Sequence, residues 1–201
     1  MGGREIVIVR PRDFEDLLTE EAFEHEELLP YWAHLWASAV ALADAVSEEA
    51  VAGLRVLELG CGLGLPSIAA ARAGARVTAI DWSPDASAAA RANAALNAVE
   101  LETLTVDWDA PEVLLERAPW DLVVAADVLY ERTKVTAMLD LLPRLGDHVL
   151  LAEPGRMPSE PFFEQARELW ERVEVEGASR PRAKVHRLRR RPAGPSGATE
   201  R

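Results

Sequence analysis

From Leu54 onward, short apolar runs alternate with helix-like segments, and this rhythm restricts the possible folds more than any other feature. The apolar runs lie at residues 55–59, 76–80, 101–106, 121–126 and 148–152. Helix-like segments separate them at residues 66–73, 83–97 and 134–145. Alternating strand and helix signals predict an α/β fold built on a parallel sheet. Residues 122–126 show no polar alternation, which is typical of a central strand covered on both faces.

The residues before this repeating part predict a mainly helical N-terminal region. Residues 5–9 favour a short strand, and residues 13–29 are acidic and helix-prone. Pro30 breaks the chain, and an apolar helix is expected to follow as far as about Val46.

The residues after Leu151 predict a different ending. A helix is expected over residues 160–172, followed by strands at 173–176 and 184–189. Two successive strands without an intervening helix indicate an antiparallel finish to the sheet. The basic stretch from Arg180 fits a contact with RNA. Its alternation at 182–190 fits an edge strand equally well, because charge protects a sheet edge from further pairing.

The length of 201 residues fits one domain. We expect a single domain over residues 1–191, with a helical cap at about 13–50 and a core at 54–191. Residues 192–201 are rich in Pro, Gly, Ser, Ala and Thr and are predicted to be a disordered tail.

The charge balance bears on the possible partners. Lys and Arg number 22 and Asp and Glu number 34, which gives a formal net charge of −12. The stretch from Arg180 to the end has eight bases and one acid, so it carries +7 and the preceding residues carry −19. Such acidity counts against nucleic acid and anionic membranes as partners.

Targeting and redox features predict a cytoplasmic protein. Cys61 is the single cysteine and cannot form an internal disulfide, as is usual in a reducing compartment. No run of about 18 apolar residues predicts a membrane span, and the first residues lack the apolar core of a signal peptide.

A glycine-rich turn follows the first predicted core strand, with the sequence Glu58-Leu59-Gly60-Cys61-Gly62-Leu63-Gly64. Glycines at alternate positions allow a tight turn and a close approach of a ligand to the main chain. Leu65 stands where a dinucleotide fingerprint needs Gly or Ala, and the Lys of a phosphate-binding Walker loop is missing. The turn therefore favours a cofactor other than NAD or a nucleoside triphosphate.

An acid lies at or just after the end of each predicted strand of the core. These acids are Glu58, Asp81, Asp107, Asp127 and Glu153. Parallel strands bring such ends to one edge of the sheet, where open α/β folds bind ligands. A carboxylate-rich edge repels phosphates and suits a cofactor with a sulfonium, an ammonium and ribose hydroxyls. Asp81 lies 21 residues after Gly60, where an acid that binds the ribose hydroxyls is expected.

Several short motifs occur in one order along the chain. They are Pro30-Tyr31-Trp32-Ala33-x-x-Trp36, the turn at residues 58–64, Asp81, Ala126-Asp127-Val128-Leu129-Tyr130 and Glu153-Pro154-Gly155-Arg156. Together they resemble the family-16 protein lysine methyltransferases, and within them the group that acts on the electron transfer flavoprotein β-subunit. The resemblance covers about residues 25–190. It implies a doubly wound, mostly parallel sheet of seven strands, a Rossmann-like methyltransferase fold, preceded by N-terminal helices.

The resemblance also implies S-adenosylmethionine as the cofactor, with S-adenosylhomocysteine as the product. The residues it implies for cofactor binding are Trp36, Glu58, Gly60, Gly62, Gly64, Asp81, Trp82, Asp107, Trp108 and Asp127. Among these, the glycines would hold the methionine part, Glu58 would lie near its amino group, and Asp81 would hold the ribose. Asp127 and Tyr130 would border the transferring methyl group as catalytic residues. We expect Asp127 to position a lysine amine and Tyr130 to shape its access.

Other interpretations of individual residues stay open. Trp32 and Trp36 fit a hydrophobic core as well as a ligand site. Glu153 fits either a wall of the site or an ion pair with Arg156. The four histidines show no ligand spacing, so no metal site is expected.

Other functions stay open too. A small-molecule N-methyltransferase would use the same loops, so the acceptor is either a protein or a small-molecule amine. A non-catalytic module that binds S-adenosylmethionine is a different class. Methylation of nucleic-acid amino groups is disfavoured, because Asp127-Val128-Leu129-Tyr130 lacks the paired prolines of those enzymes. The position of Leu65 disfavours an NAD-dependent oxidoreductase.

Overall fold

The computed structural model describes residues 5–12, 17, 29–175 and 183–192. Its helices and strands follow one another in this order: η3 (Tyr31–Ala33), α2 (Ala37–Glu48), β1 (Arg55–Leu59), α3 (Leu65–Arg72), β2 (Arg76–Asp81), α4 (Pro84–Leu96), β3 (Glu102–Thr105), α5 (Glu112–Leu115), β4 (Leu122–Ala126), α6 (Arg132–Leu145), β5 (His148–Glu153), α7 (Ser159–Ala166), β6 (Trp170–Glu174) and β7 (Lys184–Arg190). Of the cap predicted at about 13–50, residues 13–16 and 18–28 lie outside the described residues. The predicted tail lies outside them except for Pro192.

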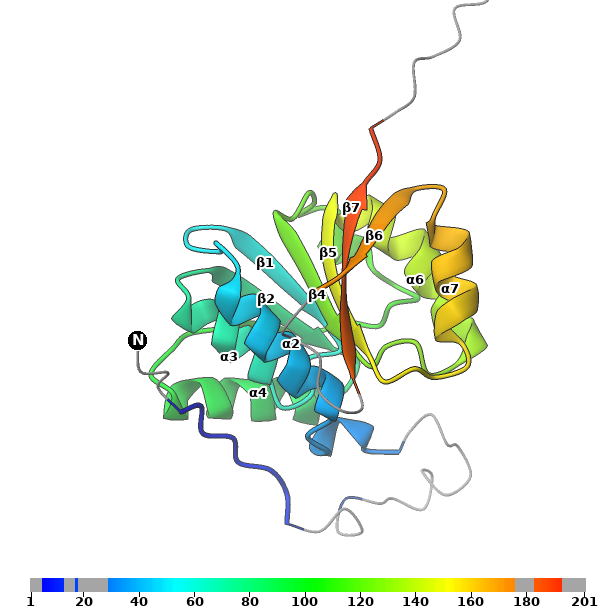
Figure 1. The fold of residues 1–201 in the computed structure, drawn as a ribbon. Coiled ribbons are helices and arrows are strands. Elements are labelled where there is room, and N and C mark those ends of the chain that lie inside the picture. Colours follow the sequence, from blue (N-terminus) through cyan, green and yellow to red (C-terminus); the bar gives the residue numbers. More distant parts are fainter. Residues whose placement is uncertain (1–4, 13–16, 18–28, 176–182, 193–201) are drawn as a thin grey trace, which may run out of the picture.

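The strands form one sheet in the order β3-β2-β1-β4-β5-β7-β6 (Figure 1). The first five of these pair in parallel, and β7 runs antiparallel to both β5 and β6. The strand order reverses between β1 and β4, which is the point where open α/β sheets bind ligands. The seven-stranded, mostly parallel sheet predicted from the sequence is confirmed.

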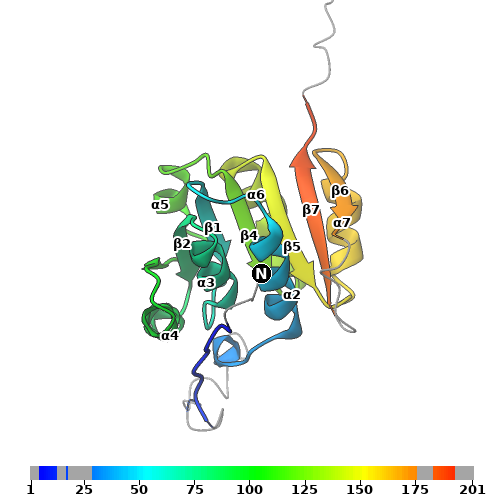
Figure 2. The same cartoon turned by 60° about the vertical axis from the view of Figure 1, so that its left-hand side comes forward.

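Helices cover both faces of the sheet (Figures 1 and 2). On one face, α2 packs on β4, β5 and β7, while α3 and α4 pack on β1, β2 and β3. On the other face, buried residues of α6 and α7 share a core with Leu57, Val123 and Leu151. Successive residues of β4 alternate between the two cores, with Val124 on the α2 side and Val123 on the α6 side. This double burial explains the unbroken apolar sequence of β4.

Two predictions for the C-terminal part were wrong in detail. Helix α7 ends at Ala166 rather than residue 172, because Trp170 begins β6 and is 2% exposed in the core of the α6 face. The basic strand β7 lies between β5 and β6, so β6 is the edge strand and not β7. The arginines of β7 therefore do not protect a sheet edge.

Residues 5–9 are extended, but they form no strand. Instead, the side-chain amides of Asn93 on α4 and of Asn97, the residue directly after α4, replace a neighbouring strand. The Val9 backbone N–H donates to Asn93 Oδ1 at 2.8 Å, and Asn93 Nδ2 donates to the Val9 carbonyl at 3.0 Å. Asn97 makes the same pair of hydrogen bonds with Val7, at 3.0 and 2.7 Å. The N-terminal segment is thereby attached to the helix that follows β2.

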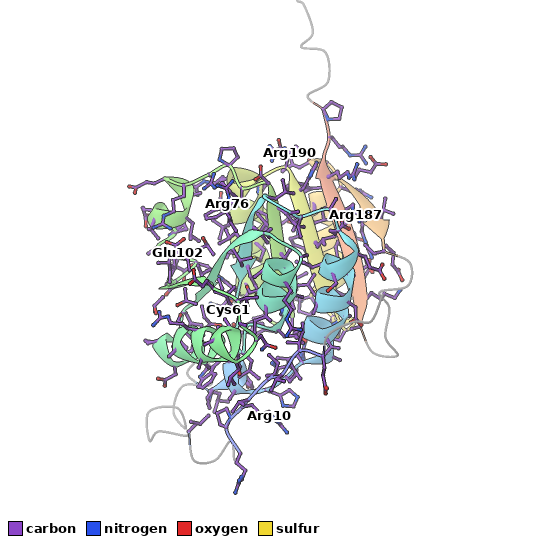
Figure 3. All side chains as sticks on the ribbon, turned by 90° about the vertical axis from the view of Figure 1, so that its left-hand side faces the viewer. Arg10, Cys61, Arg76, Glu102, Arg187 and Arg190 are labelled. Atoms are coloured by element: carbon purple, nitrogen blue, oxygen red, sulfur yellow. The ribbon has the colours of Figure 1, made fainter. Side chains whose placement is uncertain are left out.

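The two ends of the sheet differ in what surrounds them. The N-terminal segment and the start of α2 lie at the lower end in Figure 1, where the parallel strands end. Figure 3 shows Arg76, at the start of β2, and Arg190, at the end of β7, toward the opposite end from Arg10. The candidate site lies at the lower end. Among the helices of the described residues, none is long and apolar enough to cross a bilayer.

Candidate active site

A cleft of about 470 Å³ lies at the carboxyl ends of the parallel strands. Its walls combine the turn after β1, residues that follow β2, β3 and β4, and η3 with the start of α2. These segments are far apart in sequence and meet because parallel strands end at the same edge of the sheet. A cleft of this volume suits a small-molecule ligand or cofactor.

The turn after β1 is held by the acid at the end of β2. Gly60, Gly62 and Gly64 have φ angles of 67°, 48° and 81°, in the left-handed region that favours glycine. The Gly62 backbone N–H donates to Asp81 Oδ2 at 3.0 Å, and the backbone N–H of Ser83 donates to Asp81 Oδ1 at 3.0 Å. Burial raises the pKa of Asp81, although these hydrogen bonds act to lower it. Asp81 thus fixes the turn while it lines the cleft.

Glu58 is a buried carboxyl group on β1 that also lines the cleft. The Ser67 backbone N–H donates to its Oε2 at 2.9 Å, and the Ser67 hydroxyl donates to the same oxygen. Burial raises the pKa of Glu58 from 4.5 to about 8. At neutral pH the group therefore holds a proton and adds no negative charge to the cleft.

Aromatic rings reach the cleft from separate parts of the chain. Trp82 follows β2 and is 45% exposed, and Trp108 follows β3 and is half-buried. Trp108 lies close to the turn, since a Cβ added at Gly60 would be 3.4 Å from its ring. From the segment before the sheet, Trp36 also lines the cleft, and its Nε1 donates to the Tyr31 carbonyl at 3.1 Å. Flat apolar surfaces beside the Asp81 carboxylate suit a nucleoside.

Asp127, directly after β4, has both carboxylate oxygens engaged. Arg156 Nε donates to Oδ1 at 2.7 Å, and the Ser38 hydroxyl donates to Oδ2 at 3.1 Å. Asp127 also has a φ of 60°, which is uncommon for a residue other than glycine. Ser38 lies on α2 and Arg156 follows β5, so three separate segments meet at this carboxylate.

Tyr130 stands at the same edge and is 38% exposed. Burial, together with the nearby carboxylates of Glu131 and Asp81, raises its pKa to about 12. Its phenol therefore stays protonated at neutral pH and can donate a hydrogen bond. Glu131 also lines the cleft, and its Oε2 accepts a hydrogen bond of 3.3 Å from the Thr133 hydroxyl.

Comparison with known proteins agrees with this arrangement. Residues 23–167 match the lysine methyltransferase family. The chain belongs to the lysine methyltransferase family. The matched residues contain the glycine turn, Asp81, Asp127 and Arg156, so the cleft lies inside the part that defines the family.

Individual relatives in and around this family match over part of their length. The electron transfer flavoprotein beta subunit lysine methyltransferase of Xenopus laevis is 37% identical over 135 residues, which cover 63% of this chain and 53% of that protein. The protein N-lysine methyltransferase METTL21A of Danio rerio is 36% identical over 130 residues, or 59% of this chain and 58% of that protein. The chain spans about half the length of the curated relatives that it matches first.

A solved structure shares the fold at lower identity. Magnesium protoporphyrin IX methyltransferase from Synechocystis PCC 6803, with bound SAM, superposes with a TM-score of 0.60. It is 21% identical, and the match covers 77% of each chain. This likeness supports the methyltransferase fold of the family member described here.

The structure brings most of the predicted site residues of this lysine methyltransferase family member to one cleft. Those that line it are Trp36, Glu58, Gly60, Gly62, Gly64, Asp81, Trp82, Trp108, Asp127 and Tyr130. Asp107 is the exception. It is exposed, does not line the cleft, and accepts a hydrogen bond from the Asp109 backbone N–H at 3.0 Å. The functional roles of the residues in the cleft stay predictions.

Glu153 takes neither of the two expected positions. It does not line the cleft and does not pair with Arg156. Its Oε1 lies 3.1 Å from Nε2 of the buried His186, and its Oε2 accepts a hydrogen bond from the Gly155 backbone N–H at 2.5 Å. Burial acts to raise the pKa of Glu153, but these hydrogen bonds together outweigh it and lower the pKa. Glu153 thus supports the turn that carries Arg156.

Sequence reasoning gave no role to several residues that line or support the cleft. Arg156 was visible as part of the Glu153-Pro154-Gly155-Arg156 motif, but its partner was not. Glu131 follows Tyr130 and could have been found as a further acid at the same strand end. Ser38 had no signal, because it lies in a helix of small residues 89 positions before Asp127. Among the described residues, no group of three or more His, Cys, Asp or Glu side chains is arranged to hold a metal ion.

Proposed function

We propose that this protein is an S-adenosylmethionine-dependent methyltransferase that methylates a lysine side chain of a protein substrate. One observation carries the proposal. A single cleft, within the residues that match the lysine methyltransferase family, joins the glycine turn, Asp81, four tryptophans, Asp127 and Tyr130. The named relatives are protein lysine methyltransferases, which supports lysine as the acceptor.

The side chains in the cleft fit S-adenosylmethionine. Asp81 offers a carboxylate for ribose hydroxyls, and the faces of Trp82 and Trp108 suit an adenine ring. The described lining residues include two basic side chains, His34 and Arg156, and no phosphate-binding cluster. The carboxylates favour a cation over a phosphate. When bound, this cofactor supplies a methyl group that is already activated by a positively charged sulfur.

The protein itself then mainly positions the acceptor and excludes water. A lysine amine has a pKa of about 10.4 in water and must lose a proton before it attacks. Asp127 and Glu131 offer carboxylate oxygens that can orient an ammonium or amine at the cleft. Tyr130, with its pKa of about 12, serves as a hydrogen-bond donor and not as a base.

The exposed rim of the cleft fits a protein acceptor better than a small-molecule acceptor, which would need an enclosed site. Tyr31 and Tyr130 are each more than a third exposed while they line it. Such rings give a protein segment apolar surface around the methylated side chain. As part of the same proposal, the single cysteine supports a cytoplasmic location. The net acidity of the chain disfavours nucleic acid as a partner.

The test is methyl transfer from methyl-labelled S-adenosylmethionine to proteins of the source organism. We expect the purified protein to label one or a few host proteins. Asp81→Asn should reduce this labelling about 10-fold or more, because it weakens the cofactor site, while Asp85→Asn, an exposed acid on α4, should not. Label found only in small molecules, or none in any fraction, would overturn the proposal.

A further inference from the structure

Arg156 presents an incompletely used guanidinium group to the cleft. Its side chain is 39% exposed and lines the cleft. Nε donates to Asp127 at 2.7 Å, and the guanidinium carbon lies 5.6 Å from the centre of the Trp36 ring. Among the described residues, its two terminal nitrogens have no hydrogen-bond partner. The group is thus fixed on one side by a carboxylate and an aromatic ring, with donors left for a ligand.

The charges in the cleft give this guanidinium a specific use. Asp81, Asp127 and Glu131 line the cleft as acids, and Glu58 is protonated at neutral pH. A ligand carboxylate is repelled by such surroundings unless a cation accepts it. An arginine meets a carboxylate with two parallel N–H donors, which makes Arg156 well suited to this contact.

The order of the strands places this group away from the nucleoside side. Asp81 and Trp82 follow β2, on one side of the central strand β1. Asp127 follows β4 and Arg156 follows β5, both on the other side of β1. A cofactor whose adenosine lies toward β2 extends its amino-acid part toward β4 and β5. There the Arg156 guanidinium, held by Asp127, matches the carboxylate of this amino-acid part.

We propose that Arg156 binds the carboxylate of the methionine part of the cofactor, and that Asp127 holds the Arg156 guanidinium in place for this contact. This inference rests on the proposed function. A purely structural role is the competing explanation, in which Arg156 only neutralises Asp127. The two explanations differ in one respect. If Arg156 contacts the cofactor carboxylate, the affinity of the protein for the cofactor depends on that carboxylate, and in a purely structural role it does not.

The test compares two ligands by titration calorimetry on the full chain. S-adenosylmethionine is one, and decarboxylated S-adenosylmethionine, which keeps the adenosine, the sulfonium and the amine, is the other. We expect the wild-type protein to bind the first about 10- to 100-fold more tightly. Arg156→Gln should lose this preference and bind both ligands within about threefold of each other. Arg156→Lys should retain part of it, and Arg144→Gln, an exposed arginine paired with Asp140, should retain all of it.

The possible failures are distinguishable. A wild-type protein that binds neither ligand overturns the proposed function together with this inference. A wild-type protein that binds both ligands equally, or an Arg156→Gln variant that loses affinity for both equally, overturns only the role of Arg156. Melting temperatures of the variants show whether they fold. If Arg156→Gln does not fold, the comparison of the two ligands is made with Arg156→Lys instead.

Discussion

Asp127 and Arg156 join the loops after two neighbouring strands, β4 and β5, through an ion pair of 2.7 Å. This pair bears on the positioning role predicted for Asp127. A carboxylate that accepts hydrogen bonds from both Arg156 and Ser38 has a well-defined position. The cleft therefore acts through positioning, with Asp127 as a fixed oxygen toward which an amine can be oriented.

Asp127→Asn separates the charge of this residue from its backbone conformation. Asn tolerates a φ of 60° as well as Asp does, so the fold should be kept. We expect the rate of methyl transfer at saturating cofactor to fall about 100-fold, because the acceptor amine loses its orienting carboxylate. Asp140→Asn, an exposed acid on α6, is the control and should retain the wild-type rate. An Asp127→Asn variant within twofold of the wild type would contradict a role for this carboxylate.

Glu58→Gln tests the protonation of the buried carboxyl group. The folded protein holds a proton on Glu58 up to about pH 8, whereas the unfolded chain loses it near pH 4.5. The folded state therefore binds more protons between these values, and the wild-type free energy of unfolding falls as the pH rises through this window.

Glu58→Gln removes this loss, because its side chain has no charge at any pH. Without cofactor, we expect its melting temperature to exceed that of the wild type by about 5 °C more at pH 8 than at pH 5. Glu160→Gln, an exposed glutamate on α7, should show no such difference between the two pH values. If the melting temperatures of Glu58→Gln and the wild type change in parallel with pH, Glu58 is ionised in the folded protein.

Gly64→Ala and Gly53→Ala form a matched pair. Their φ angles are almost equal, at 81° and 78°, so both variants carry the same left-handed strain of about 1–2 kcal/mol. Only at Gly64 does the new Cβ meet another atom, 2.9 Å from the Cβ of Ala90, whereas nothing lies within 4 Å at Gly53. We expect Gly64→Ala to lose about 1–3 kcal/mol more, measured by urea unfolding. Equal losses would show that α4 can move away from the turn.

Asn93→Ala tests the attachment of the N-terminal segment. It removes the partner of the Val9 N–H and carbonyl, and also a donor to the Leu63 carbonyl beside the glycine turn. We expect the protein to lose about 1–3 kcal/mol in stability and the Val9 amide to exchange faster with solvent. Leu96→Ala, at a position of the same helix that is 58% exposed, is the control. Equal stability and equal amide exchange in the two variants would contradict this attachment.

The sheet could be predicted because its signals are local. Apolar runs such as 122–126 and the helices between them are visible within a few residues, and parallel pairing follows from their alternation. The N-terminal segment could not be predicted in the same way. Its partners, Asn93 and Asn97, lie 84 and 90 residues away on a helix, and side-chain amides do the pairing. The position of β7 inside the sheet likewise depends on a partner, β6, that the alternation of β7 does not reveal.

The same limit applies to the site. Asp81 and the glycine turn follow the rule that parallel strands end at one edge, and they lie in the cleft. Asp107 also follows the end of a parallel strand, but its side chain accepts a hydrogen bond from the Asp109 backbone N–H and does not line the cleft. The ion pair of Asp127 depends on β4 and β5 being neighbours, which motif spacing alone does not state. Which strand ends meet at the cleft was therefore predictable, and the specific side-chain contacts made there were not.

The chemical identity of the methylated product tests the central claim most directly. Host proteins labelled with methyl-labelled S-adenosylmethionine and this protein would be hydrolysed to amino acids, and the labelled species identified by mass spectrometry. A cleft that orients an amine beside Asp127 predicts label in ε-N-methylated lysine, and none in methylarginine. Label in any amino acid other than lysine, or label confined to small molecules, would contradict the account.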